Sequence, residues 1–482
     1  MYLRNMITMS ELYTLTLQQT IEGLKKKDFT SKEITDACLE RIEKTDDSIK
    51  SFITVIKDRA VSQAEKADVL ISNDPSIWDT KPFLGVPFSI KDLFNTAGIL
   101  TTASSNILRD YIPVYDATVY KRLIDAGAIL LGKTNTDSFA HGSSTETSDF
   151  FTTSNPWDTK KLPGGSSGGS AASVIADQSI FSIGSETAGS IRQPGSWCGI
   201  VGLKPTYGRA SRYGVVAMSS SLDCPGPMTK TVWDAAKVLE IIGGKDEYDA
   251  TTSLLPVPVY TEKLPQKLDG LKIGISSKYF DGVQKEIVQA LQNGLKILEK
   301  QGARVIDVEL FDPKYAISVY TIQQRSEVSS NLARYDGVRF GNKRDNFNKE
   351  NRNRIMFGTY SLSAGYYDAY YKKAAKVRSL FVEDFKKVFK DVDVIIGPTT
   401  PTTALPKGAS ELSDMFGELQ DILVEPSTIS GLPGINIPCG FDKEHMPIGM
   451  QIFAPQFEEK KIIDVAYVFE QATDFHLQKP NL

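Results

Sequence analysis

The sequence has few histidines and cysteines and no long apolar run. Its 482 residues include three histidines, at positions 141, 445 and 476, and none are paired at the HxxH or HxxxH spacing of a zinc site. Four cysteines, at positions 38, 198, 224 and 439, form no CxxC motif, which is typical of reduced thiols in a cytoplasmic protein. No run of about 18 apolar residues is present, and the first fifteen residues lack the apolar core of a signal peptide. We therefore expect a cytoplasmic protein with no membrane span and no metal or cofactor of its own.

An excess of charge of either sign is also missing. The chain has 55 Lys and Arg against 59 Asp and Glu, for a net charge of -4. This balance gives no electrostatic reason for the chain to hold nucleic acid by itself, so we expect any RNA to be held by a partner. With 41% hydrophobic and 24% charged residues, the composition is that of a globular protein. The length is sufficient for one large core or for two to three ordinary domains.

Short β-rich runs alternate along the chain with amphipathic helical patterns. This alternation predicts an α/β fold, with a central mixed sheet and helices on both faces, in one large domain over residues 1–482. Strands are expected at 51–56, 86–90, 128–131, 179–183, 271–275, 305–308, 392–396 and 435–438, and helices at 119–126, 285–300, 315–335, 366–390 and 459–472. The Thr30–Glu33 capping box predicts one further helix start. Residues 251–268 are either a link between two domains or, as we favour, a long surface connection within one.

Two segments rich in small residues follow one another in the middle of the chain. The first, GGSSGGS at 164–170, has the composition of a linker, but a helix-compatible run and the strand 179–183 follow it directly. Glycines at a helix start let backbone amides approach a ligand closely. The second, GSETAGSIRQP at 184–194, leaves that strand and leads into a short helix. Such a turn can present a serine beside amides that bind an oxyanion. By itself, the segment fits a tight connection with capping serines equally well.

No histidine is placed to activate such a serine. His445 and His476 lie in segments expected at the surface, and His141 is expected to be a bystander even if it lines a pocket. A buried lysine can act as a base instead, because burial lowers its pKa from about 10.4 to roughly 7–8. Lys91 follows the expected strand 86–90, and sites in α/β folds gather at strand ends. By itself, a lysine after a strand is ordinarily a solvated charge.

Taken together, the lysine and the two motifs resemble the amidase-signature family. Both motif strings match, and so does the spacing: Lys91 lies 75 residues before Ser166, which lies 24 residues before Ser190. The resemblance implies that Ser190 is the nucleophile, that Lys91 is the neutral base, and that Ser166 is a bridging serine held after a cis peptide bond. It also implies an oxyanion hole made by backbone amides of the turn that contains Thr187, Ala188 and Gly189.

A nucleotide-binding loop is the competing interpretation of one segment. Residues 127–134, GAILLGKT, satisfy the P-loop pattern GxxxxGK[ST]. In a P-loop the strand precedes the first glycine, whereas here the intervening Ala-Ile-Leu-Leu has the pattern of the buried strand itself. We therefore expect no nucleotide site at Lys133.

Further segments resemble one branch of the family, the glutaminase subunits of tRNA-dependent amidotransferases. They are FAHGSSTE at 139–146, NPWD at 155–158, NLARYDG at 331–337, GTY at 358–360, GYYDAYY at 365–371 and GLPG at 431–434. The resemblance implies a glutaminase that supplies ammonia to a partner, which uses ATP to convert Glu-tRNA(Gln) to Gln-tRNA(Gln). The implied partners are B-type and C-type subunits in a heterotrimer, with ATP and Mg at the partner and Glu-tRNA(Gln) held mainly there.

The same resemblance implies the residues that bind glutamine. Arg354 would meet the α-carboxylate, Asp421 would meet the α-ammonium, and Tyr320 would line the same pocket. A zwitterionic amino acid needs a guanidinium and a carboxylate in this way. Without the resemblance, Arg354 and Asp421 could equally belong to surface ion pairs.

The chain also departs from the family. Glu186 and Ala188 alter a turn that commonly reads Asp-Thr-Gly-Gly-Ser, although an alanine with negative φ keeps its backbone amide available. Glu425 stands where the family is apolar, STIS at 427–430 replaces a more typical Val-Asn-Leu-Ala, and the segment 341–353 is shortened. These changes leave open a stand-alone amidase acting on another small carboxamide. A catalytically silent scaffold is disfavoured because all three triad residues are present.

Overall fold

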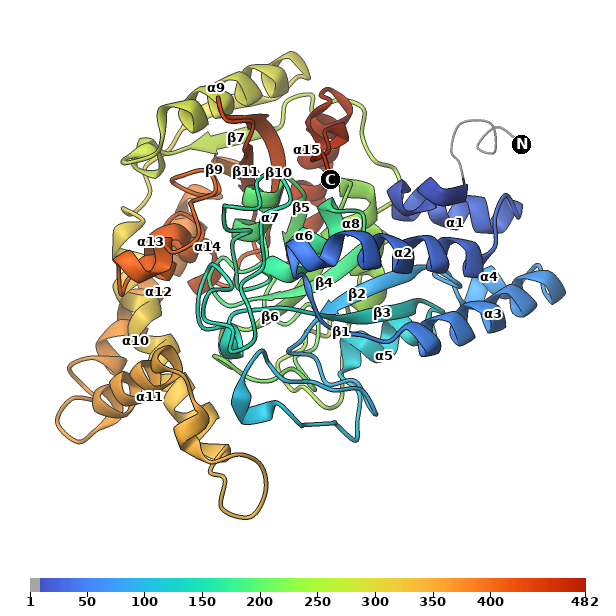
Figure 1. The fold of residues 1–482 in the computed structure, drawn as a ribbon. Coiled ribbons are helices and arrows are strands. Elements are labelled where there is room, and N and C mark those ends of the chain that lie inside the picture. Colours follow the sequence, from blue (N-terminus) through green and yellow to red (C-terminus); the bar gives the residue numbers. More distant parts are fainter. Residues whose placement is uncertain (1–8) are drawn as a thin grey trace.

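The structure of the protein is a computed structural model that describes residues 9–482. At its centre is one eleven-stranded sheet in the order β1-β3-β2-β4-β6-β5-β10-β11-β9-β7-β8 (Figure 1). The strands are β1 (Phe52–Val55), β2 (Pro87–Lys91), β3 (Ile129–Thr134), β4 (Phe181–Glu186), β5 (Val201–Lys204), β6 (Cys224–Thr229), β7 (Lys272–Ile275), β8 (Arg304–Asp307), β9 (Val394–Pro398), β10 (Gly434–Phe441) and β11 (Pro447–Phe453). Strand β2 runs parallel to β3 and β4, β7 runs parallel to β8 and β9, and the other neighbours are antiparallel. The predicted mixed α/β sheet is confirmed.

Helices surround the sheet. They are α1 (Leu17–Lys26), α2 (Ser31–Ile49), α3 (Lys57–Asn73), α4 (Ile77–Thr80), α5 (Thr118–Asp125), α6 (Gly168–Ile175), α7 (Arg192–Cys198), α8 (Val232–Ile242), α9 (Lys285–Lys300), α10 (Lys314–Asn331), α11 (Lys349–Leu362), α12 (Tyr371–Val388), α13 (Phe416–Asp421), α14 (Glu425–Ile429) and α15 (Glu459–Gln471). The predicted capping box is formed at the start of α2, where Thr30 and Glu33 each bond the other's backbone amide. None of the helices within residues 9–482 is long and apolar enough to cross a membrane.

The alternation of side chains along β2 decides which face carries the polar chemistry. Phe88 and Ile90 belong to the large apolar core that also contains residues of α5 and α8. Ser89 points the other way, and its hydroxyl lies 3.1 Å from that of Ser173 on α6. Because successive side chains of a strand face opposite sides, Lys91 lies on the face of Ser89, toward α6. Helices therefore pack on both faces of the sheet.

Every strand expected from the sequence is present within a few residues, but three strands were not expected. These are β5, β6 and β11. In β6, CPGPMT, two prolines argue against a strand inside a sheet. Its ladder with β5 involves only Thr229 and Met228, so Pro225 and Pro227 lie where β6 pairs with β4 alone. Both prolines therefore lie outside the ladder with β5.

The connection at 251–268 joins strands of the same sheet. It runs from α8 to β7, and the strands before and after it lie in the one eleven-stranded sheet. Tyr260 in the middle of the connection is fully buried, and its hydroxyl donates to Glu459 Oε2 at 3.3 Å. The segment is thus packed onto the body of the molecule.

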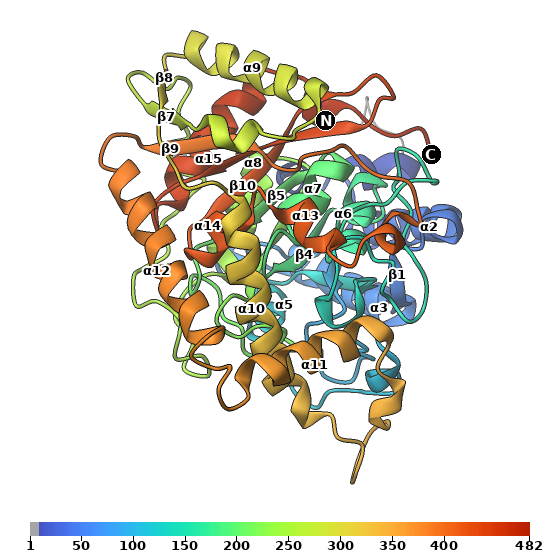
Figure 2. The ribbon, with the colours of Figure 1, turned by 90° about the vertical axis from the view of Figure 1, so that its left-hand side faces the viewer.

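The helices α10, α11 and α12 form the part of the molecule that projects at the lower left of Figure 1. Figure 2 shows α10 running alongside α13 and α14, with α11 below them. Helix α10 packs against α11, α12, α13 and α14. This arrangement brings residues from distant parts of the sequence to one side of the sheet.

The segment that fits the P-loop pattern is a strand. Gly132, Lys133 and Thr134 are the last residues of β3, and the Lys133 side chain is fully buried. Its Nζ lies 3.2 Å from Asp92 Oδ1 and donates to Phe94 O at 2.7 Å. This lysine is a structural ion-pair partner and has no free ammonium group for a phosphate.

Candidate active site

Lys91 and Ser166 meet on the α6 face of the sheet. Lys91 is the last residue of β2, and Ser166 lies just before α6. Lys91 Nζ is 2.7 Å from Ser166 Oγ and 3.2 Å from the carbonyl oxygen of Ser185. Two residues 75 positions apart, which the sequence could only associate by resemblance, are in direct contact.

Burial gives Lys91 the character of a base. The side chain is fully buried, and this lowers its pKa from 10.5 to about 7, although the charges of Asp137, Asp223 and Glu186 oppose the shift. A lysine with such a pKa is substantially neutral near pH 7 and can accept a proton. A solvated lysine at a strand end is not buried, so its pKa would not be lowered in this way.

The glycine-rich loop holds Ser166 by contacts on both sides. The Gly165–Ser166 peptide bond is cis, as the resemblance implies. A Cβ at Gly165 would collide with Asp137 Oδ2, so only glycine fits between the loop and that carboxylate. The amide of Gly165 donates to Gln193 Oε1 at 2.8 Å, and Thr136 Oγ1 donates to the Ser166 carbonyl at 2.7 Å.

The turn before α7 places Ser190 next to this loop. The backbone amide of Ser167 donates to the Ser190 carbonyl oxygen at 3.1 Å, which joins the two motifs directly. The Ala188 carbonyl accepts a hydrogen bond from Thr428 Oγ1 at 2.6 Å. The Gly189 carbonyl accepts one from the backbone amide of Gln193 at 2.7 Å. By contrast, none of the backbone amides from 187 to 190 has an acceptor within residues 9–482. Unpaired amides in a buried turn are the donors that an oxyanion requires.

The unusual residues of the turn fit together. Ala188 does not have a positive φ, so the turn does not require a glycine at this position. Glu186 is fully buried and paired with Arg192, with Arg192 Nη2 2.6 Å from Glu186 Oε1. Arg192 also donates to Ser427 Oγ at 2.9 Å and to Thr428 Oγ1 at 2.8 Å. The departures at 186, 427 and 428 are therefore parts of one hydrogen-bonded network.

Several buried polar residues of the site were not expected from the sequence. Asp137 accepts from the amide of Ser144 at 3.2 Å, and Asp223 accepts from Thr187 Oγ1 at 2.7 Å. Thr428 bonds the turn from α14. A single aspartate after a strand has no pattern that would mark it, because its partner lies far away in the sequence, whereas Thr428 stood out in the sequence only as part of the departure at 427–430.

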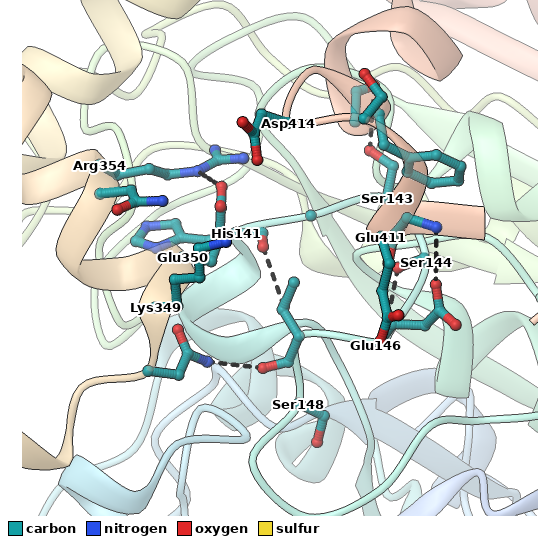
Figure 3. A pocket seen from close by; sticks show the side chains of 18 of the residues that line it. His141, Ser143, Ser144, Glu146, Ser148, Lys349, Glu350, Arg354, Glu411 and Asp414 are labelled. Atoms are coloured by element: carbon teal, nitrogen blue, oxygen red, sulfur yellow. Dashed lines mark hydrogen bonds and ion pairs between the residues drawn. The ribbon is translucent and has the colours of Figure 1, made fainter. Parts of the chain in front are cut away.

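A cavity of about 580 Å³ opens beside the loop that contains Ser143 and Ser144. Figure 3 shows Arg354 and Glu350 of α11 on one wall and Ser143 and Ser144 on another. Because a Cβ at Gly165 would also meet the Ser144 amide, this serine pair lies directly against the loop of Ser166. The cavity is lined by residues that include His141, Ser143, Ser144, Asn348, Glu350, Arg354 and Glu418.

The structure brings Asp421 close to the turn and places Arg354 and Tyr320 nearby. A Cβ at Gly189 would collide with Asp421 Oδ1, and Ser143 Oγ donates to Asp421 Oδ2 at 2.9 Å. Arg354 is buried, and its Nε donates to Glu350 Oε1 at 2.6 Å. Burial raises the pKa of Tyr320 above its ordinary value. The charge of Arg354 opposes this shift, and the charge of Asp421 adds to it. No hydrogen bond joins these three predicted residues to one another within residues 9–482.

His141 lies in the cavity wall and is held as a neutral ring. Its Nδ1 is 2.6 Å from Asn351 Oδ1, while Asn351 Nδ2 donates to Ser138 Oγ. This arrangement assigns the proton to Nδ1. Burial, followed by the charge of Arg354, lowers the pKa of His141 well below its ordinary value. His445 is exposed, and His476 is half-buried close to the C-terminal end.

Within the part of the chain from residue 9 onward, no group of three His, Cys, Asp or Glu side chains could hold a metal ion. The structure gathers a lysine, two serines and unpaired backbone amides close to a charged cavity. This composition suits acyl transfer by a covalent serine mechanism.

The chain is similar along most of its length to proteins named as amidases and amidotransferase subunits. The family model described as Amidase matches residues 33–463. The A subunit of glutamyl-tRNA(Gln) amidotransferase from Desulfatibacillum aliphaticivorans is 46% identical, over 98% of this chain and 100% of that protein. The solved structure of the corresponding A subunit from Thermotoga maritima has a TM-score of 0.78 and 38% identity, covering 97% of this chain and 95% of that one. Peptide amidase from Stenotrophomonas maltophilia has a TM-score of 0.83 at 29% identity, covering 97% of this chain and 98% of that one.

The family model covers most of the chain, and the similarity to A subunits extends along nearly all of it. The chain therefore belongs to the amidase family, in the group of glutamyl-tRNA(Gln) amidotransferase A subunits.

Proposed function

We propose that this chain is the glutaminase subunit of a glutamyl-tRNA(Gln) amidotransferase and that it hydrolyses glutamine with Lys91, Ser166 and Ser190. The observation that carries the proposal is the buried contact of 2.7 Å between Lys91 and Ser166, next to the turn of Ser190. The similarity to A subunits along 98% of the chain supports the choice of glutamine.

The reaction proceeds by acyl transfer to Ser190. Neutral Lys91 accepts the proton of Ser166, which takes up the proton of Ser190 as the Ser190 oxygen attacks the side-chain carbonyl carbon of glutamine. The amides of the turn, which include those of Thr187, Ala188 and Gly189, stabilise the oxyanion of the tetrahedral intermediate. The intermediate collapses, the C–N bond breaks, and the relayed proton leaves with ammonia.

A water molecule then attacks the γ-glutamyl ester of Ser190. The same relay accepts a proton from water and returns one to the Ser190 oxygen as the ester bond breaks. The products are glutamate and ammonia, and the free enzyme is restored with Lys91 neutral.

Charged groups around the cavity recognise the rest of glutamine. In this proposal the α-carboxylate binds Arg354, the α-ammonium binds Asp421, and Tyr320 closes the pocket. Arg354 uses its Nε for Glu350, and its Nη atoms form no hydrogen bond within residues 9–482. Those two nitrogens are available for a bidentate contact with a carboxylate.

Ammonia leaves for a partner in this proposal. We assign the transfer to a B-type subunit that holds ATP, Mg and most of Glu-tRNA(Gln), with a C-type subunit completing a heterotrimer. The net charge of -4 agrees with a chain that leaves tRNA binding to a partner. The whole chain, residues 1–482, acts as one unit in the assembly.

Replacing Arg354 with alanine tests the assignment. Glutamine-dependent formation of Gln-tRNA(Gln) by the reconstituted complex should fall about 30-fold or more, because the substrate carboxylate loses a buried charge-assisted pair. The same complex given ammonium chloride should form Gln-tRNA(Gln) at close to the parent rate. Loss of both activities would assign Arg354 to the assembly or the fold instead.

A stand-alone amidase for another small carboxamide is the second candidate. The pairing of Arg354 with Glu350 favours it, because a substrate carboxylate must share that guanidinium. This candidate is the better one if no B-type subunit binds and the isolated chain hydrolyses simple carboxamides rapidly.

Thr428 offers a test of the oxyanion turn. Thr428→Val removes the hydroxyl that donates to the Ala188 carbonyl at 2.6 Å while keeping the shape of the side chain. The peptide that follows Ala188 then loses its anchor, so kcat for glutamine should fall about 10- to 100-fold with little change in KM. Thr428→Ser should recover most of the activity. An unchanged kcat in the valine variant, with an unchanged melting temperature, would show that the turn does not depend on this bond.

A further inference from the structure

Glu425 is a buried carboxylate without a partner. It is the first residue of α14, its side chain is 0% exposed, and neither Oε1 nor Oε2 has a hydrogen-bond partner within residues 9–482. Burial of a charged group without a partner is costly, so native structures rarely contain one without a function. Both side-chain oxygens of Glu425 therefore lack a hydrogen-bond donor within residues 9–482.

Other acidic side chains lie close to Glu425. Burial raises the pKa of Glu425 well above its ordinary value, the charges of Asp421 and Glu418 raise it further, and the charge of Arg354 opposes the shift. Glu418 already accepts from Arg325 Nη2 at 2.9 Å, and Arg354 donates to Glu350. Arg325 and Arg354 are therefore engaged with other carboxylates, and no ion pair within residues 9–482 joins Glu425 or Asp421 to a cation.

Asp421 shares this deficiency. Its Oδ2 accepts from Ser143, but its buried Oδ1 has no partner within residues 9–482. Three acceptor oxygens therefore stand open in this region, two on Glu425 and one on Asp421. An ammonium group has three donors and no acceptor, so its hydrogen-bonding capacity matches these oxygens in number.

The segment that bears both carboxylates lies against the turn of the nucleophile. A Cβ at Gly189 would meet Asp421 Oδ1 and Val424 Cγ2, which places this segment against the residue that precedes Ser190. A small amide bound with its carbonyl carbon at Ser190 would therefore lie next to this segment. The two carboxyl groups are thus placed to contact the part of the substrate that lies beyond its amide group.

We propose that Glu425 is a specificity-determining residue that shares the substrate's ammonium group with Asp421, so that the pocket selects carboxamides bearing a free ammonium group. The inference rests on the proposed hydrolysis of an amide at Ser190. It adds a second carboxylate to the recognition of the cationic group.

Glu425→Gln tests the proposal with glutamine and N-acetylglutamine, which differ in the ammonium group. In the parent protein we expect kcat/KM for glutamine to exceed that for N-acetylglutamine by at least 100-fold. Glu425→Gln should raise KM for glutamine by about tenfold or more and leave kcat within about threefold, which reduces the discrimination by the same factor. Glu425→Leu should have an effect in the same direction.

Glu470→Gln is the matched control. Glu470 is also a buried glutamate, and burial raises its pKa to about 8, but it accepts from the Val232 amide on the opposite side of the sheet from α6. This variant should keep the parent ratio between the two substrates. Melting temperatures of all variants report whether a substitution acts through the fold.

A protonated Glu425 that serves only packing predicts a different result, because glutamine has nearly the same shape. An unchanged KM and an unchanged substrate ratio in Glu425→Gln would overturn the proposal. If the parent hydrolyses neither compound, the proposed function fails. Calorimetric binding of the two compounds to Ser190→Ala, with and without Glu425→Gln, then still decides the ammonium preference.

Discussion

Ser190→Ala should lower the rate of amide hydrolysis by about 10⁴-fold or more while the protein stays folded. The substitution removes the oxygen that forms the acyl-enzyme, and the remaining oxyanion donors cannot replace a covalent intermediate. The measurement is glutamine hydrolysis by the purified protein, or by the complex if the partner subunits are required. Accumulation of an acyl-enzyme, detected by mass spectrometry in the parent, should disappear in the variant.

Ser154→Ala is a suitable control for the removal of a buried hydroxyl. The Ser154 hydroxyl donates to the carbonyl of Ser48 at 2.7 Å, outside the contacts that surround Lys91. Removing this hydroxyl should lower the free energy of unfolding by about 1–3 kcal/mol at most, and it should leave kcat close to the parent value. Residual activity of Ser190→Ala within tenfold of the parent would remove Ser190 from the mechanism.

Lys91→Met should abolish turnover to a similar extent. Methionine keeps the aliphatic bulk of the side chain but cannot accept a proton. Lys91→Arg should also be inactive, because a guanidinium remains protonated throughout the working range of pH. Both rates are measured by ammonia release at saturating glutamine, with circular dichroism as a check on folding.

The pH dependence of the parent follows from the same residue. Lys91 must be neutral to act as a base, and its pKa is lowered to about 7. The value of kcat/KM should therefore rise as pH increases from about 6 to about 8 and then level off. His141→Ala should keep this profile and at least a tenth of the activity, since the neutral His141 ring bonds Asn351. An inactive His141→Ala together with an active Lys91→Ala would assign the base to the histidine.

The residues that differ from the motifs implied by the resemblance have a physical account in the structure. Glu186, Ser427 and Thr428 looked like separate changes in the sequence, but Arg192 contacts all three. The network holds the turn of Ser190 from two directions, and Ala188 fits the turn because its φ is not positive. Glu425 remains outside this network, which is why it carries a separate proposal.

The fold could be predicted from local patterns where a strand or helix follows its own periodicity. The alternating β-rich runs around β2, β3 and β4 and the amphipathic pattern of α9 were sufficient, because side-chain burial repeats along each element. Strand β6 was missed because its two prolines contradict strand propensity, and only its position beside β4 makes them acceptable. The order of the strands was also beyond local patterns, since β10 and β11 lie between β5 and β9.

The sequence by itself determined that a lysine, two serines and glycine-rich turns are present at the spacing of a known family. Only the tertiary structure decided that Lys91 touches Ser166, because the contact depends on the alternation of β2 and on the packing of α6 beside it. The lowered pKa of Lys91 was likewise not readable from the sequence, since it is caused by burial beneath segments that are distant along the chain. The unpartnered carboxylate of Glu425 is another such feature, because whether a carboxylate has a partner depends on which distant side chains the fold brings within hydrogen-bond distance.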